Sequence, residues 1–108
     1  MSTAFVSSLR ASRPPIMMSA AESGALTIRV EASDLWDAVR VVADRDTTVA
    51  EVKQRVALEF YPNQGFLDEL VLKLRGWEIL DESQPLTKAG IVDGSIVLLA
   101  HRRRRPVR

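Results

Sequence analysis

The sequence contains no cysteine and only one histidine, His101. The lack of cysteine excludes disulfides, thiolate metal sites, iron–sulfur clusters and a cysteine nucleophile. The sequence also shows no nucleophile–base pair, no phosphate-binding glycine loop and no dinucleotide motif. Its longest apolar runs are about five residues, too short to span a bilayer. We therefore expect no enzymatic activity, no metal, no cofactor and no membrane span, and a cytoplasmic location agrees with the absence of cysteine.

Positive charge is concentrated at the two ends of the chain. The chain has 108 residues, which is enough length for one compact domain, and its net charge is +1. Residues 26–100 contain thirteen acidic and eight basic side chains, whereas the ends contain seven basic side chains and a single acid, Glu22. The sequence therefore predicts an acidic body with basic ends.

Residues 1–24 show no sustained periodicity. They are rich in Ser and Ala and contain no acid before Glu22. We interpret them as an N-terminal arm without regular structure. Two alternatives remain open: an organellar transit peptide, and extra sequence upstream of a start at Met17 or Met18.

The rest of the chain has the periods of regular elements. Apolar residues alternate with polar ones over 26–31, 39–43, 70–75 and 96–100, which predicts strands, and 77–80 is expected to form a short edge strand. Thr48 and Glu51 have the spacing of a helix capping box, and apolar residues recur every three or four positions up to Phe60. Pro62 forbids continuation of this helix.

One hydrophobic core is expected between the helix and the sheet. Its members are the apolar residues on the inward phase of each element. They are Leu26, Ile28, Val30, Val39, Val41, Val49, Val52, Val56, Leu70, Leu72, Leu80, Leu86, Ile91, Val97 and Leu99.

Three segments carry a resemblance to a known family. Residues 48–53 are similar to the Thr-Ile-x-x-Val-Lys that opens the helix of ubiquitin-like domains, and Leu72, Leu74 and Gly76 match the Leu-x-Phe-x-Gly of the third strand. Residues 86–98 resemble the final turn, hairpin and strand. The resemblance implies an α+β, ubiquitin-like β-grasp fold over residues 25–100, with a mixed four- to five-stranded sheet packed on one helix. It also implies that Lys53 pairs with Asp81 or Glu82.

The C-terminal sequence separates this chain from the conjugated members of that family. Conjugated members end in a flexible Gly-Gly, whereas here residues 101–108 form a basic tail and no two glycines are adjacent. We therefore expect a non-conjugating, non-covalent protein-interaction module. A narrower resemblance, carried by Leu86, Gly90, Ile91 and Gly94, is to the small ubiquitin-like component of bacterial type VII secretion loci.

The family resemblance implies a partner-binding face on the sheet. The residues that it selects are Lys73, Leu98 and Ala100, with Val71 at the border and Trp77 on the exposed edge. A lysine replaces the central isoleucine of ubiquitin, so a wholly apolar receptor would bind poorly. The alternative is that these are ordinary outward residues of a sheet.

The tail is the second candidate site. Its arginines suit phosphate oxygens, because a guanidinium donates two parallel hydrogen bonds. The candidate anion-binding residues are Arg102, Arg103, Arg104, Arg105 and Arg108. Nucleic acid, an anionic membrane surface and an acidic protein groove are open as ligands, although no interleaved aromatic supports base stacking. The alternative is a solvated tail.

Trp36 and Trp77 are the only tryptophans. Tryptophan is enriched at interface hot spots, but it is also common in partly buried packing, which we expect for both. No specific role is expected for His101.

Overall fold

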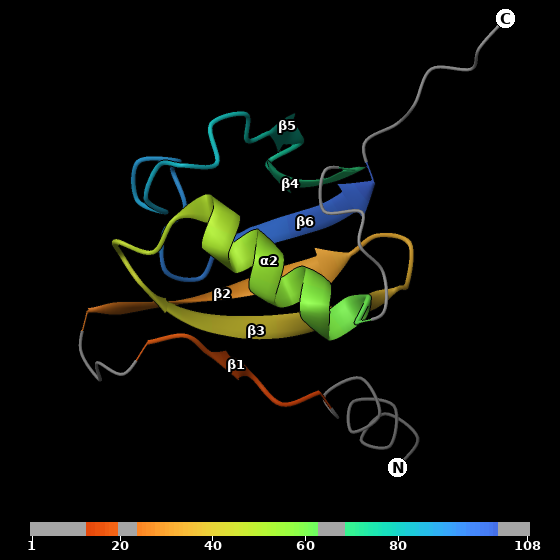
Figure 1. The fold of residues 1–108 in the computed structure, drawn as a ribbon. Helices are drawn as coiled ribbons and strands as arrows, with labels where there is room; N and C mark the ends of the chain where they lie inside the picture. The colour runs from red at the N-terminus through yellow and green to blue at the C-terminus, as the bar shows by residue number, and fades with distance from the viewer. Residues whose placement is uncertain (1–12, 20–23, 63–68, 102–108) are drawn as a thin grey trace, which may run out of the picture.

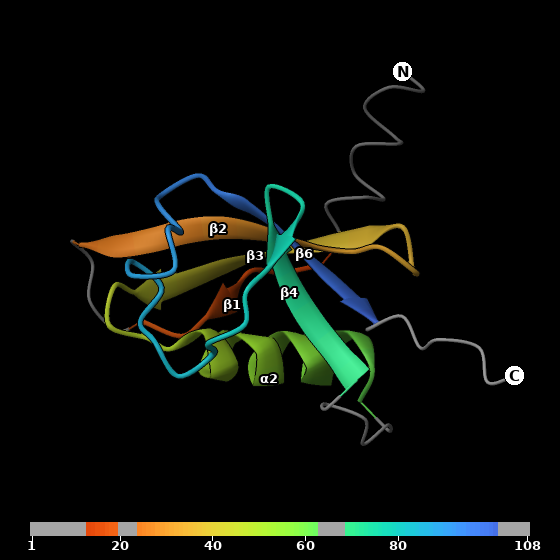
Figure 2. The same cartoon turned by 90° about the horizontal axis from the view of Figure 1, so that it is seen from above.

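The computed structural model describes residues 13–19, 24–62 and 69–101. Six strands and one helix follow one another along these residues. They are β1 (Ile16–Met17), β2 (Ala25–Ala32), β3 (Asp37–Asp44), α2 (Val49–Phe60), β4 (Leu70–Leu74), β5 (Trp77–Glu78) and β6 (Ile96–His101). The strands form one sheet in the order β1-β3-β2-β6-β4-β5, and α2 lies along one of its faces (Figures 1 and 2). The predicted α+β architecture is confirmed, with six strands instead of four or five.

The middle of the sheet is a parallel pair made of two segments far apart in sequence. β2 pairs with β6 in parallel. β3 pairs with the other edge of β2, and β4 with the other edge of β6, both antiparallel. The turn before β6 fixes this arrangement, because Gly94 N donates to Thr27 O (2.8 Å) and Thr27 N donates to the Asp93 carboxylate (2.8 Å). Gly94 has a φ of +88°, a conformation that glycine adopts without strain.

The helix begins at the predicted capping box. Glu51 N donates to Thr48 Oγ1 (3.2 Å), and Thr48 N donates to Glu51 Oε1 (2.9 Å), so each residue satisfies an amide of the other. The helix ends at Phe60, where Tyr61 N donates to Ala57 O (2.7 Å). Among the described residues, no helix has the length and apolarity needed to cross a membrane.

The core lies between α2 and the sheet, and every predicted core residue except Leu80 is buried. Leu80 is 82% exposed, and its neighbour Ile79 is buried instead. The reason is that β5 ends at Glu78, so the side-chain alternation assumed for 77–80 does not continue. Ile79 N donates to Leu72 O (2.9 Å), which holds this side chain against the core.

Part of the N-terminal arm belongs to the sheet. The expectation of no regular structure over residues 1–24 is wrong for 13–19, because Ile16 and Met17 pair in parallel with Val41 and Val42 of β3. Ile16 is 3% exposed and joins the core. Residues 1–12 and 20–23 lie outside the described residues, and so do 102–108 of the predicted tail.

Arg13 ties this segment to the domain. Its guanidinium contacts the carboxylates of Asp37 and Glu59, at 2.7 Å each. The same group lies over the ring of Phe60, 4.8 Å from the centroid. Arg13 therefore links β1 to the start of β3 and to the last turn of α2.

This cluster predicts a dependence of stability on acid. Burial alone would raise the pKa of Asp37, but hydrogen bonds from Arg13 and from the Ala38 N–H outweigh it and leave the pKa below its ordinary value. A carboxyl whose pKa is lower in the folded than in the unfolded state stabilises the fold above its unfolded pKa of about 4. That stabilisation is lost as the pH falls through the lower, folded value.

We therefore expect Asp37→Asn to reduce the fall in thermal unfolding midpoint between about pH 5 and pH 2. The midpoint is measured by circular dichroism against the native chain. Asp46→Asn, at an exposed loop position, serves as the control. If the Asp37→Asn variant and the native chain were equally sensitive to acid, Asp37 would not be the source of the acid-dependent stability.

Candidate functional site

The face of the sheet opposite α2 carries the outward side chains of its central strands. We call this the open face and define it by Thr27, Arg29 and Glu31 of β2, Ile96, Leu98 and Ala100 of β6, and Val71 and Lys73 of β4. These residues alternate with core residues along each strand. A single row crosses its middle, because Leu98 pairs with Glu31 on one side and with Lys73 on the other. Leu98 thus lies between a carboxylate and an ammonium group.

The predicted partner-binding residues fall into three positions. Lys73, Leu98 and Ala100 are adjacent on the open face, and each is half-buried. Val71 is opposite Ala100 but only 1% exposed, so the expectation that it offers binding surface at the border is wrong. Trp77 lies on β5, at the edge of the sheet, where it pairs with Leu74.

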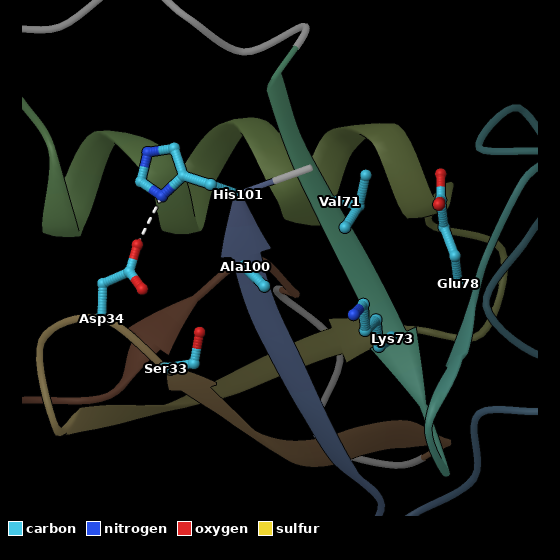
Figure 3. A pocket seen from close by; sticks show the side chains of 7 residues that line it. All are labelled: Ser33, Asp34, Val71, Lys73, Glu78, Ala100 and His101. Atoms are coloured by element: carbon cyan, nitrogen blue, oxygen red, sulfur yellow. Dashed lines mark hydrogen bonds and ion pairs between the residues drawn. The ribbon is translucent and has the colours of Figure 1, made fainter. Parts of the chain in front are cut away.

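A depression of about 470 Å³ lies over the β4 and β6 end of the open face. Figure 3 shows Val71 and Ala100 between two sets of polar side chains, with Asp34 and His101 on one side and Lys73 and Glu78 on the other. Ser33 completes the lining. Its floor is apolar and its rim carries both signs of charge.

His101 and Asp34 form one wall of this depression. His101 Nδ1 lies 2.5 Å from Asp34 Oδ2, and the imidazole packs edge-on against Tyr61 with ring centroids 5.4 Å apart. Burial raises the pKa of the Tyr61 phenol, as does the charge of Asp34, so the ring stays neutral at physiological pH. No sequence pattern groups these three residues, because they come from a turn, a helix end and the last strand.

A second depression, of about 630 Å³, lies at the other end of the same face. Ile96 and Leu98 contribute apolar surface to it, and Ile96 is exposed. Lys73 lines both depressions. The Lys73 ammonium therefore stands between two hollows that could each accept a side chain of a partner.

Both tryptophans are exposed, so the expectation of partial burial is wrong. Trp77 is 79% exposed and Trp36 is 96% exposed. Trp36 has a φ of +54°, in the left-handed region that costs a non-glycine residue about 1–2 kcal/mol. It lies in the turn between β2 and β3 and is part of neither strand.

The open face carries both donors and acceptors of hydrogen bonds. Within 13–19, 24–62 and 69–101, no three His, Cys, Asp or Glu side chains gather in a way that could hold a metal ion. Lys73 can donate to acceptors, while Glu31 and Glu78 can accept. The predicted anion-binding residues Arg102 to Arg105 and Arg108 lie outside the described residues, so their role stays a prediction.

Comparison with known proteins supports the fold. No protein-family model and no curated protein sequence matches the chain. Solved structures do match. Ubiquitin of Caldiarchaeum subterraneum has a TM-score of 0.63 and 19% identity, over 77% of this chain and 100% of its own.

Two ubiquitin-like domains are similarly close. One is from an Arabidopsis thaliana protein, with a TM-score of 0.61 and 20% identity over 83% of this chain and 90% of that domain. The other is from Plasmodium falciparum Dsk2, with a TM-score of 0.59 and 19% identity over 71% and 97%. These likenesses confirm the predicted ubiquitin-like β-grasp fold.

Proposed function

We propose that this protein is a non-conjugated ubiquitin-like interaction module that docks a protein partner on its open face. The observation that carries the proposal is the row Glu31–Leu98–Lys73, which places a half-buried leucine between two opposite charges and between two depressions. An apolar centre with a polar rim is the usual composition of a protein interface.

Lys73 determines the chemistry of the partner. Covering an ammonium with apolar surface is unfavourable unless it meets an acceptor. Lys73 lies on β4 opposite Glu78 of β5 and lines both depressions of the open face. The partner is therefore expected to present an Asp or Glu opposite Lys73, beside an aliphatic side chain that fits against Leu98.

The test compares two leucine substitutions of the same chemistry. Leu98→Asp is expected to weaken binding of a captured partner by about thirtyfold or more, the effect of a hot-spot residue. Leu58→Asp changes an exposed leucine on α2 and should leave the affinity unchanged. Affinity is measured by titration calorimetry with the partner recovered by crosslinking and mass spectrometry.

Lys73→Glu provides an independent check of the charge. We expect it to abolish binding to a partner that presents an acid opposite residue 73, because the two negative charges repel. Binding that survives both Leu98→Asp and Lys73→Glu would overturn the proposal.

Three finer predictions accompany this function. We propose a cytoplasmic location, which cell fractionation tests. The resemblance to a type VII secretion component is tested by the genes adjacent to this one. Non-conjugation predicts that mass spectrometry of cell extracts finds no other protein joined through a lysine to this chain.

A further inference from the structure

The turn between β2 and β3 presents two apolar side chains to solvent. Leu35 is exposed and Trp36 almost completely so. Trp36 also adopts the left-handed backbone conformation, which bulky residues rarely adopt and glycine adopts readily. Neither burial nor backbone preference explains a tryptophan at this position. Strained backbone held at an exposed apolar side chain points to a ligand outside the domain.

The two carboxylates that flank this tip are already engaged. Asp34 contacts His101, and Asp37 contacts Arg13 at 2.7 Å. The Arg13 guanidinium therefore offsets the negative charge of Asp37 beside Leu35 and Trp36. This pairing lowers the repulsion that an anionic surface would meet at the tip.

The described part of the chain begins and ends near the same tip. Arg13 and His101, the residues at which the described chain begins and ends, contact the two carboxylates just named, and Figure 1 shows the end of β6 on the side of the β2–β3 turn. Residues 1–12 and 102–108 contain no acid in the sequence. Seven residues extend at most about 25 Å, so the arginines that follow His101 stay within reach of Trp36.

We propose that this tip binds an anionic lipid surface, with Leu35 and Trp36 at the headgroup level and the arginines of 102–108 on the lipid phosphates. Tryptophan prefers the membrane interface, because its ring is apolar and its N–H donates a hydrogen bond. A basic cluster supplies the second signal that stable peripheral binding needs. Single-stranded nucleic acid is less well matched, because base stacking uses several aromatics along a charged groove. This surface is separate from the open face.

The two tryptophans provide the experiment with its own control. In full-length Trp77→Phe, Trp36 is the sole tryptophan, and its emission is expected to shift to the blue when vesicles of phosphatidylcholine and phosphatidylserine are added. In full-length Trp36→Phe, the emission of Trp77 is expected to stay unchanged. Trp77 pairs with Leu74, and Leu74 pairs with Val97, which is at the opposite end of β6 from His101. Vesicles of phosphatidylcholine alone should produce neither change.

Co-sedimentation with the same vesicles measures the contribution of each part. Trp36→Gly is expected to lower the partition coefficient roughly tenfold or more, and deletion of 102–108 roughly a hundredfold or more. Glycine suits the φ at position 36, so this variant is expected to fold, which circular dichroism verifies. Leu98→Asp should bind vesicles normally, which separates this test from that of the open face.

Several outcomes would overturn the proposal. They are an absence of sedimentation with the phosphatidylserine vesicles, equal sedimentation with phosphatidylcholine alone, and sedimentation with no shift of Trp36 emission. Retention on duplex DNA or on polyglutamate without vesicle binding would also overturn it, and would assign the tail to a nucleic acid or to an acidic protein.

Discussion

Ile16→Ala is expected to lower the free energy of unfolding by roughly 2–4 kcal/mol. Ile16 is buried in the core and pairs with Val41, although β1 has only two residues. Truncation of a buried isoleucine removes apolar contacts and leaves a cavity that neighbouring side chains fill only in part. Urea unfolding followed by circular dichroism measures the change.

Met17→Ala is the matched control, because Met17 is on the same strand but exposed. Its effect should stay within about 0.5 kcal/mol, as is usual for surface substitutions. A chain that starts at Met17 or Met18 loses both Ile16 and the two carboxylate contacts of Arg13, and should be less stable than Ile16→Ala. Equal and small effects of Ile16→Ala and Met17→Ala would show that the segment is not part of the core.

The helix and the long strands were predictable because each repeats a signal over many residues. The capping box and the apolar stripe located α2, and alternation located β2, β3, β4 and β6. β1 was not predicted, because a strand of two residues shows no period. Ile16 is buried through pairing with a strand far along the chain. Leu80 was wrongly assigned to the core for a related reason: β5 ends at Glu78, so the side-chain alternation does not extend to residue 80.

The candidate site was predictable only in the part that follows from strand phase. Phase and the family resemblance placed Lys73, Leu98 and Ala100 together, as the register shows. The wall made by Asp34 and His101 depends on the parallel pairing of β2 with β6, because that pairing brings the end of β6 beside the β2–β3 turn. Ser33 N donates to Leu99 O (3.1 Å) at this junction. The periodicity of a sequence does not reveal which distant strands pair with each other.

The exposure of Trp36 illustrates a different limit. Apolar composition predicts burial on average, but it does not predict which apolar residue a turn leaves outside. The left-handed φ of Trp36 is a property of the folded hairpin and has no counterpart in a sequence pattern. Trp36, which sequence reasoning placed wrongly, is thus a residue that the structure makes a candidate for contact with other molecules.

The second large effect concerns the nearly buried Lys53 on α2. Its Nζ lies 2.7 and 2.9 Å from the two carboxylate oxygens of Glu82 and donates to Leu70 O (3.1 Å). Glu82, and not Asp81, is therefore the partner. The ammonium group is thus satisfied by one charged acceptor and one backbone carbonyl, and it links the helix to β4 and to the loop that follows β5.

Glu82→Ala is expected to lower the free energy of unfolding by roughly 2–4 kcal/mol, because it leaves an ammonium group in low-dielectric surroundings with only one acceptor. The double variant Lys53→Met with Glu82→Leu removes both charges at similar volume and should be less destabilised than Glu82→Ala alone. Asp81→Ala is the control, since the exposed Asp81 bonds locally to Ser83. If urea unfolding shows that Glu82→Ala and Asp81→Ala have the same effect, the Lys53 contact adds no stability, and the helix is held to the sheet by apolar packing alone.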